Sequence, residues 1–194
     1  MIPARTSQLP SAGLLTAGLA LALGLRMALA GDEGTRSAAA GLAFAGALGA
    51  LVIASPWRPA TPRLRDALVG IGGGSILVLP ALYFRATTLV PVLGFPPSSF
   101  PTWVLVVGAV ALSEEMLLRG ALFAAIAASS GVTTAVSVTA IVFALLHVPL
   151  YGWGALPLDL AVGVWLSGLR AVTGSVTAPA VAHLLADGAA WWVM

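Results

Sequence analysis

Six ionisable side chains stand inside long apolar stretches of this sequence, where an exposed charge is unfavourable. They are Glu114, Glu115, Arg119, His147, His183 and Asp187. A charged side chain at the centre of a bilayer costs roughly 2.5–3.5 kcal/mol even on the most lenient insertion scale, so several of them unpaired in lipid would cost on the order of 10 kcal/mol. They must therefore face the interior of the molecule and pair there or meet water. A structural ion pair explains two such residues but explains six poorly, which indicates a functional site.

The spacing of these residues supports a shared site. Residues four apart lie on one face of a helix, and this spacing relates Glu115 to Arg119, Phe143 to His147, and His183 to Asp187. Glu114 lies one position round its helix, so Arg119 can neutralise one carboxylate while the other stays available. Three helices thus each contribute one polar face, and carboxylates and imidazoles are the usual groups for proton transfer.

The elements that carry these residues are predicted to be transmembrane helices. Hydrophobic residues make up 59% of the 194 residues and charged residues only 8%, and the mean hydropathy is +1.02. A soluble domain carries about 25% charged residues, so this chain cannot cover itself in water. Because the apolar runs do not alternate with polar residues, barrel strands are excluded. The sequence predicts an all-α membrane protein with a single transmembrane domain over residues 1–194.

Polar, proline and glycine breaks divide the chain into seven candidate spans of about the 20 residues that a helix needs to cross a bilayer. The predicted spans are 11–30, 38–55, 67–85, 102–128, 132–148, 156–170 and 175–193. The fourth is long enough to tilt or break. The active site is expected between the later helices, in a catalytic core over about 102–193, with residues 1–100 forming additional helices.

Charge limits the partners and suggests an orientation. The net charge is +2, and the arginines form no contiguous patch, so no nucleic acid partner is implied. The absence of Cys excludes a cysteine nucleophile and thiolate metal sites. If the N-terminus is cytoplasmic, the inner loops carry Arg5, Arg58, Arg63, Arg65 and Arg170, and the outer loops carry Arg36 and Arg85. The excess of inner arginines favours a cytoplasmic N-terminus.

Other polar and small residues have ordinary explanations. Arg26, near the end of the first span, is expected to extend to the membrane interface. Asp159 is expected to cap or charge the start of a helix. Small residues at four-residue spacing, as in Gly41-Ala45-Gly49 and Gly70–Gly74, are expected to let helices pack closely inside the molecule.

The motifs Glu-Glu-x-x-x-Arg, Phe-x-x-x-His and His-x-x-x-Asp, in this order on successive apolar helices, resemble the CAAX protease and bacteriocin-processing (CPBP or Abi) family. Members include type II CAAX prenyl endopeptidases and other intramembrane proteases. The resemblance extends from about Leu112 to Asp187, and includes Thr173-Gly174-Ser175-Val176, which leads into the last motif. It implies an intramembrane endopeptidase.

The resemblance also implies roles for the six residues. Glu114 and His147 would activate a water that attacks a peptide carbonyl. His183 with residue 187 would stabilise the oxyanion, and Arg119 would fix Glu115. Many relatives have Asn at the last position, where this chain has Asp187; an Asp can donate a hydrogen bond to an oxyanion only when it is protonated.

A metal mechanism is the alternative that the sequence leaves open. Zinc accepts two histidines and carboxylates as ligands, so Glu114, His147, His183 and Asp187 could hold Zn²⁺. The glutamate-dependent mechanism requires no cofactor. The family resemblance does not decide between the two.

The expected partners are the lipid bilayer and a membrane-anchored protein or peptide substrate. The arginine-only, Ala- and Gly-rich composition suggests a bacterial inner-membrane protein, for which a prenylated CAAX substrate is not expected. C-terminal sorting tails of surface proteins are the alternative, as in the myxosortase branch. Two other functions remain as alternatives: a transporter or proton pathway, which also uses buried carboxylates, and a catalytically silent scaffold. The oligomeric state is left open.

Overall fold

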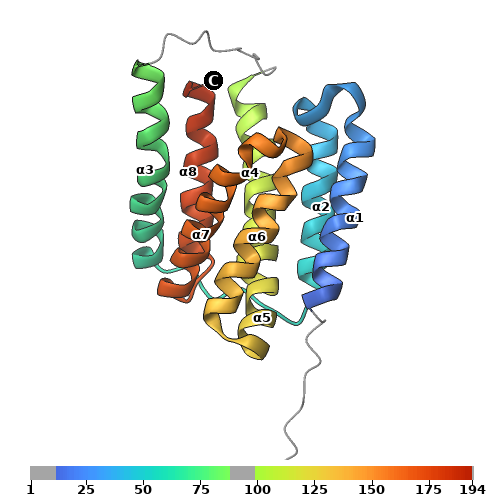
Figure 1. Cartoon of the computed structure of the whole chain (residues 1–194), viewed down its shortest axis with the longest axis vertical. Helices are drawn as coiled ribbons and strands as arrows, with labels where there is room; N and C mark the ends of the chain where they lie inside the picture. Colours follow the sequence, from blue (N-terminus) through green and yellow to red (C-terminus); the bar gives the residue numbers. More distant parts are fainter. Residues whose placement is uncertain (1–11, 88–98, 194) are drawn as a thin grey trace, which may run out of the picture.

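The structure is a computed structural model that describes residues 12–87 and 99–193, and it is a bundle of helices (Figure 1). Six helices are simple: α1 (Ala12–Ala30), α2 (Ala38–Ala54), α3 (Leu64–Thr87), α6 (Val132–Tyr151), α7 (Leu156–Thr173) and α8 (Thr177–Val193). A seventh, longer helix consists of α4 (Phe100–Glu115), the π-helical segment η2 (Met116–Leu122) and α5 (Phe123–Ser130). No strand occurs in the described ranges, which confirms the all-α prediction.

The helix boundaries follow the predicted spans to within three residues, and two of the differences lie at helix C-termini that end in glycine. Helix α6 was predicted to stop before Pro149 but continues through it to Tyr151, and it ends only at Gly152, whose φ is +81°. Helix α7 runs three residues beyond its predicted end, to Thr173, and the next residue, Gly174, caps it in a left-handed conformation. Glycine adopts positive φ without a steric penalty, so these two glycines, not the proline or Arg170, end the helices.

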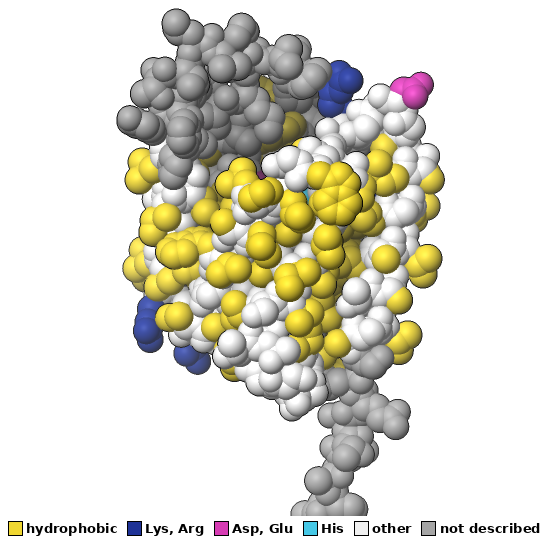
Figure 2. All heavy atoms as spheres, in the orientation of Figure 1, with side chains coloured by type: hydrophobic (Ala, Val, Ile, Leu, Met, Phe, Trp, Pro, Cys, Tyr) yellow, Lys and Arg dark blue, Asp and Glu magenta, His cyan; other side chains and the backbone are white. Residues whose placement is uncertain are grey.

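The surface of the bundle is that of a membrane protein. Figure 2 shows hydrophobic side chains over the middle of one face, with arginine and acidic side chains toward its two ends. Three helical segments are long and apolar enough to cross a bilayer, Ala12–Arg36, Val132–Tyr151 and Trp153–Thr173, and Ala38–Ala54 is a shorter apolar helix. The count of seven spanning helices stays a prediction. Arg5 and most of the predicted break from Pro91 to Pro101 lie outside the described residues.

The helices form a broad bundle with α4 and α8 near its centre. In Figure 1, α1 and α2 lie at one edge and α3 at the other, with α7 crossing in front. Close approach of α3 to α8 needs glycine: a Cβ at Gly70 would lie 2.6 Å from the carbonyl oxygen of Ala178, and one at Gly74 would lie 3.0 Å from that of Ala182. The predicted internal packing of Gly70–Gly74 is therefore confirmed.

The first small-residue motif is only partly confirmed. A Cβ at Gly41 would lie 3.1 Å from the Val106 side chain of α4, whereas one at Gly49 would meet nothing within 4 Å. One end of the motif thus packs inside the bundle and the other end faces open space.

The core surrounds η2 and so fixes the centre of the bundle. Leu117, Leu118 and Leu122 of η2 are fully or almost fully buried, together with Phe44 and Leu48 of α2. This apolar packing holds η2 between the N-terminal helices and the later ones. Three of the six predicted site residues, Glu114, Glu115 and Arg119, lie directly before and within this segment.

Candidate active site

The two adjacent glutamates lie at the end of α4, where the helix changes to π geometry. Both are buried, with Glu114 at 2% exposed and Glu115 at 0%. The π segment starts at the next residue and contains Arg119. Single π-helical turns inside α-helices occur frequently at functional sites. Here the predicted break in the fourth span coincides with the predicted site.

Arg119 is completely enclosed and is held by several partners. Its NH1 donates to Oε1 of Glu115 at 2.8 Å, NH2 donates to the Gly163 carbonyl at 3.2 Å, and Nε donates to Oγ of Ser167 at 3.4 Å. The guanidinium carbon lies 4.5 Å from the centre of the Phe143 ring. Arg119 thus ties η2 to α6 and α7, and most of its donors are in use, as a structural arginine requires.

His183 of α8 joins the same ion pair from the opposite side. Its Nδ1 lies 2.9 Å from Oε1 of Glu115, and its Nε2 lies 3.5 Å from Oδ2 of Asp187. Glu115 therefore accepts from both Arg119 and His183 through one oxygen, while its Oε2 is buried with no hydrogen-bond partner among the described residues. Through this oxygen Glu115 links α8 to the centre of the bundle.

His147 of α6 is half-buried and keeps one ring nitrogen available. Its Nδ1 lies 2.8 Å from the Phe143 carbonyl oxygen. A carbonyl can only accept, so Nδ1 carries the proton, and in the neutral ring Nε2 then has a free lone pair. The ring packs between Phe143, at 4.4 Å between centroids, and Tyr151, at 5.7 Å. This arrangement fixes the ring with Nε2 free to accept a proton or a hydrogen bond.

Glu114 differs from Glu115 because nothing holds it. Within the described part of the chain, it makes no hydrogen bond or ion pair, although only 2% of it is exposed. The ionisable groups that act on it electrostatically are His147, His183, Asp187 and Arg26. Buried polar groups are normally paired, so an unpartnered carboxylate among histidines is the feature expected of a group kept for a substrate or a water.

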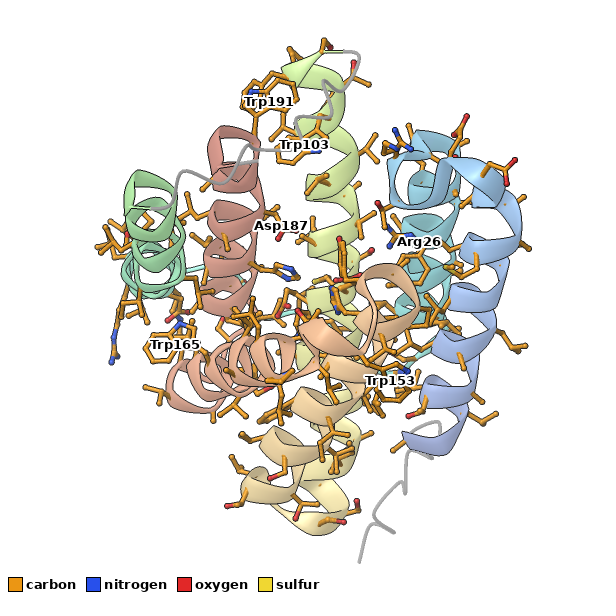
Figure 3. All side chains as sticks on the ribbon, turned by 45° about the horizontal axis from the view of Figure 1, so that its top comes forward. Arg26, Trp103, Trp153, Trp165, Asp187 and Trp191 are labelled. Atoms are coloured by element: carbon orange, nitrogen blue, oxygen red, sulfur yellow. The ribbon has the colours of Figure 1, made fainter. Side chains whose placement is uncertain are left out.

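Asp187 lies beside His183 at the more open end of the site, with its side chain 35% exposed. Figure 3 shows it on α8, on the opposite side of α4 from Arg26. The structure therefore brings all six predicted residues into one region, from α4, η2, α6 and α8. Glu115, Arg119 and His183 bond to one another and form an enclosed group. Glu114, His147 and Asp187 form a second group, which we call the open group because Asp187 is 35% exposed, although Glu114 itself is buried.

The predicted zinc ligands do not assemble into a metal site in this structure. Across the described residues, no three His, Asp or Glu side chains converge as a group able to hold a metal ion. His183 also presents both ring nitrogens to carboxylates of the protein, at 2.9 and 3.5 Å. The arrangement fits proton transfer and hydrogen bonding better than it fits a zinc ligand set.

Three further residues lie near the site that the sequence did not assign to it. Arg26 was expected at the membrane interface but is buried, 8% exposed, with its guanidinium carbon 5.0 Å above the Phe44 ring; that prediction was wrong, because tertiary neighbours enclose the side chain. Asp159 acts electrostatically on His147, and its Oδ2 is buried without a hydrogen-bond partner in the described ranges. Asp159 lies in the first turn of α7, as predicted, but the helix has no side-chain cap. The third residue is Tyr151, which stacks on His147.

The fold and this site define a helical membrane protein with a buried carboxylate–histidine centre. Comparison with known proteins gives the family: residues 96–189 match the model described as Rce1-like, type II CAAX prenyl endopeptidase Rce1-like. All six predicted residues fall within the match, and α1 to α3 lie outside it. This stretch is similar to the Rce1-like family of CAAX-type proteases, which confirms the resemblance stated above. No curated protein and no solved structure matches the chain.

Proposed function

We propose that the protein is an intramembrane endopeptidase in which Glu114 and His147 activate water for attack on a peptide bond. The observation that carries this proposal is the contrast inside the site: Glu114 is buried without a partner, while His147 keeps Nε2 free. A water between them would donate one hydrogen bond to each acceptor. The Rce1-like match supports the reaction class.

In this mechanism Glu114 takes a proton from the water while the water oxygen bonds to the peptide carbonyl carbon. The carbonyl oxygen becomes the oxyanion of a tetrahedral intermediate, and His183 with Asp187 lies where hydrogen-bond donors could stabilise it. The intermediate then collapses with cleavage of the C–N bond, and Glu114 returns its proton to the leaving amine. The products are a carboxylate and an amine. Every proton transfer uses residues of this chain.

Glu115 and Arg119 support the reaction through position alone. Their ion pair fixes the start of η2, and Glu115 also holds the His183 ring by its Nδ1. They are positioning residues in this proposal.

The distribution of arginines supports a membrane orientation. The segment between α2 and α3, which carries Arg58 and Arg63, lies at the bottom of Figure 1, and so does the end of α7 with Arg170. The opposite end carries η1 (Gly31–Arg36) with Asp32, Glu33 and Arg36. We place the arginine-rich end in the cytoplasm of a bacterial cell. The open end of the site, with Asp187, then faces the outside, where C-terminal tails of exported proteins would arrive.

The proposal is tested by reconstituting the full chain in liposomes with two membrane-tethered substrates. One is a reporter with a C-terminal transmembrane sorting tail, and the other is a farnesylated CAAX peptide. Mass spectrometry of the products locates the cut. The wild type should cleave the first substrate within or beside its apolar segment, and Glu114→Gln should not, because Gln cannot accept the proton of water.

The matched control is Glu33→Gln, the same change at an exposed residue of η1, which should cleave like the wild type. Cleavage of the sorting tail by purified Glu114→Gln would contradict the role of Glu114 as base. Cleavage of the CAAX peptide alone would keep the mechanism and overturn the proposed substrate.

A further inference from the structure

Arg26 is a buried arginine that has no hydrogen-bond or ion-pair partner among the described residues. It lies on α1, outside the Rce1-like segment, and only 8% of the residue is exposed. Its single described contact is the face of Phe44, 5.0 Å away. No hydrogen bond or ion pair to Arg26 occurs within the described ranges, whereas Arg119 has three hydrogen-bond partners. A buried charge is strongly unfavourable unless something pairs with it.

The side-chain nitrogens of Arg26 are not fully enclosed, although only 8% of the residue is exposed. The buried polar atoms that lack a partner are oxygens of Glu115 and Asp159, and no nitrogen of Arg26 is among them. Its guanidinium is therefore held in place by packing but remains reachable by a small group. Packing on Phe44 fixes its plane, which leaves its edge available for two parallel hydrogen bonds.

Arg26 lies near the proposed active site, because its helix α1 packs against η2 and α6, which carry Arg119 and His147. Arg26 acts electrostatically on Glu114 and on Tyr151, the residue that stacks on His147. Figure 3 shows Arg26 on α1 and Asp187 on α8, on either side of α4. The site is therefore bounded by carboxylates on α4 and α8 and by one unpaired cation on α1.

We infer that Arg26 binds a carboxylate of the substrate and so sets which peptides enter the site. A carboxylate is the group whose two oxygens match the guanidinium edge, and such charge-assisted pairs are about twice as strong as neutral hydrogen bonds. None of the ion pairs among the described residues includes Arg26, which leaves the place for an incoming carboxylate. This inference rests on the proposed endopeptidase function and names its substrate class: peptides with a carboxylate beside the scissile bond, either the C-terminus or an acidic side chain.

The test uses the reconstituted full chain and three synthetic transmembrane peptides of one sequence. The first has a free C-terminus and one Asp near the cut, the second has a C-terminal amide, and the third has Asn in place of the Asp. The wild type should favour the first peptide over whichever of the others lacks the recognised carboxylate. Arg26→Gln should raise KM for the first peptide by roughly 10- to 100-fold, the loss of a hydrogen-bonded charge pair, with kcat little changed, and should abolish the discrimination.

Two further variants make the result specific. Arg26→Lys keeps the charge but not the paired donors, so KM should be intermediate. Arg65→Gln removes an exposed arginine at the start of α3 and should change nothing. Equal losses on all three peptides, or a loss in kcat alone, would overturn the inference. A dependence on anionic lipid in place of peptide carboxylate would also overturn it, since Arg26 would then bind a lipid phosphate.

Binding measured without cleavage separates this inference from the proposed function. In a Glu114→Gln background, the first peptide should bind more tightly than the peptide without the recognised carboxylate, and Arg26→Gln should remove that difference. If the peptides differ in affinity and Arg26→Gln removes the difference, the result supports the carboxylate site whatever the catalytic outcome. Equal binding of all peptides overturns it. Persistent cleavage in the Glu114→Gln background would contradict the mechanism alone.

Discussion

The two adjacent glutamates of this protein have opposite surroundings, and the difference separates structure from chemistry in the site. Glu115 is enclosed, accepts from Arg119 at 2.8 Å and from His183 at 2.9 Å, and ties three parts of the bundle together. Glu114 is equally buried but has no partner in the described part of the chain. The same contrast exists between the arginines: Arg119 makes three hydrogen bonds, whereas Arg26 makes none within the described ranges and packs on an aromatic face. We propose that the paired groups stabilise the fold and that Glu114 and Arg26 are kept for ligands.

This contrast predicts that the enclosed group controls stability, with Arg119 giving the largest effect. Arg119→Ala strands the Glu115 carboxylate in the interior, which for a buried pair costs about 3–5 kcal/mol. We expect a lower free energy of unfolding, a lower yield and no cleavage. Unfolding in detergent, compared with Arg65→Ala at an exposed position, measures this. A variant that purifies normally and only turns over slowly would show that Arg119 acts on substrate.

Glu115→Gln should have the second largest effect. The amide keeps an oxygen that can accept from Arg119 at 2.8 Å but removes the charge that balances the guanidinium. We expect a loss of about 1.5–3 kcal/mol in unfolding free energy, the range for one hydrogen bond to a charged group. The same unfolding assay checks this, with Glu33→Gln as the exposed control. Unchanged stability would place Glu115 in the open group with Glu114.

His147→Gln should change the fold little and the reaction greatly. The ring makes one hydrogen bond, to a carbonyl of its own helix at 2.8 Å, so its loss should cost only about 1 kcal/mol. Loss of a general base or acid lowers turnover by about 100- to 10,000-fold. Thermal unfolding and cleavage of the tail reporter, measured on one preparation, test both halves. A large loss of stability with cleavage retained would assign His147 to packing.

Asp187→Asn should have the smallest effect and separates the two mechanisms. In the oxyanion mechanism this position donates a hydrogen bond, which Asn can do, so cleavage should be retained or improved. In the zinc mechanism Asn is a weaker ligand, and cleavage should fall together with metal content. The measurements are cleavage with and without a chelator and elemental analysis, with Asp32→Asn as the exposed control. Stoichiometric zinc in active wild type, lost in the variant along with activity, would contradict the oxyanion role.

Much of this arrangement could be predicted from the sequence, because burial of charge in a membrane has few solutions. The span boundaries followed from hydropathy, and the four-residue spacings placed Glu115 with Arg119 and His183 with Asp187, as found. The features that the sequence did not predict depend on contacts between different helices. The bond from His183 to Glu115 joins residues 68 apart, and the burial of Arg26 depends on Phe44 of the next helix. Neither contact leaves a local signal in the sequence.

The π geometry of η2 is a further example. Its seven residues, from Met116 to Leu122, have ordinary helix-forming composition. The sequence indicated only that the fourth span was long enough to bend. The irregularity lies where Arg119 meets partners on two other helices, so tertiary contacts account for it better than local preference.

The most direct test of the contrast between the two glutamates is to measure stability and cleavage of Glu114→Gln on one preparation. Glu114 has no partner to lose among the described residues, so the unfolding free energy of the Glu114→Gln variant should equal or exceed that of the wild type. Cleavage of the tail reporter by this variant should disappear. Retained cleavage would contradict the assignment of Glu114 as the base. A loss of stability as large as that of Arg119→Ala would show instead that Glu114 belongs to the structural group.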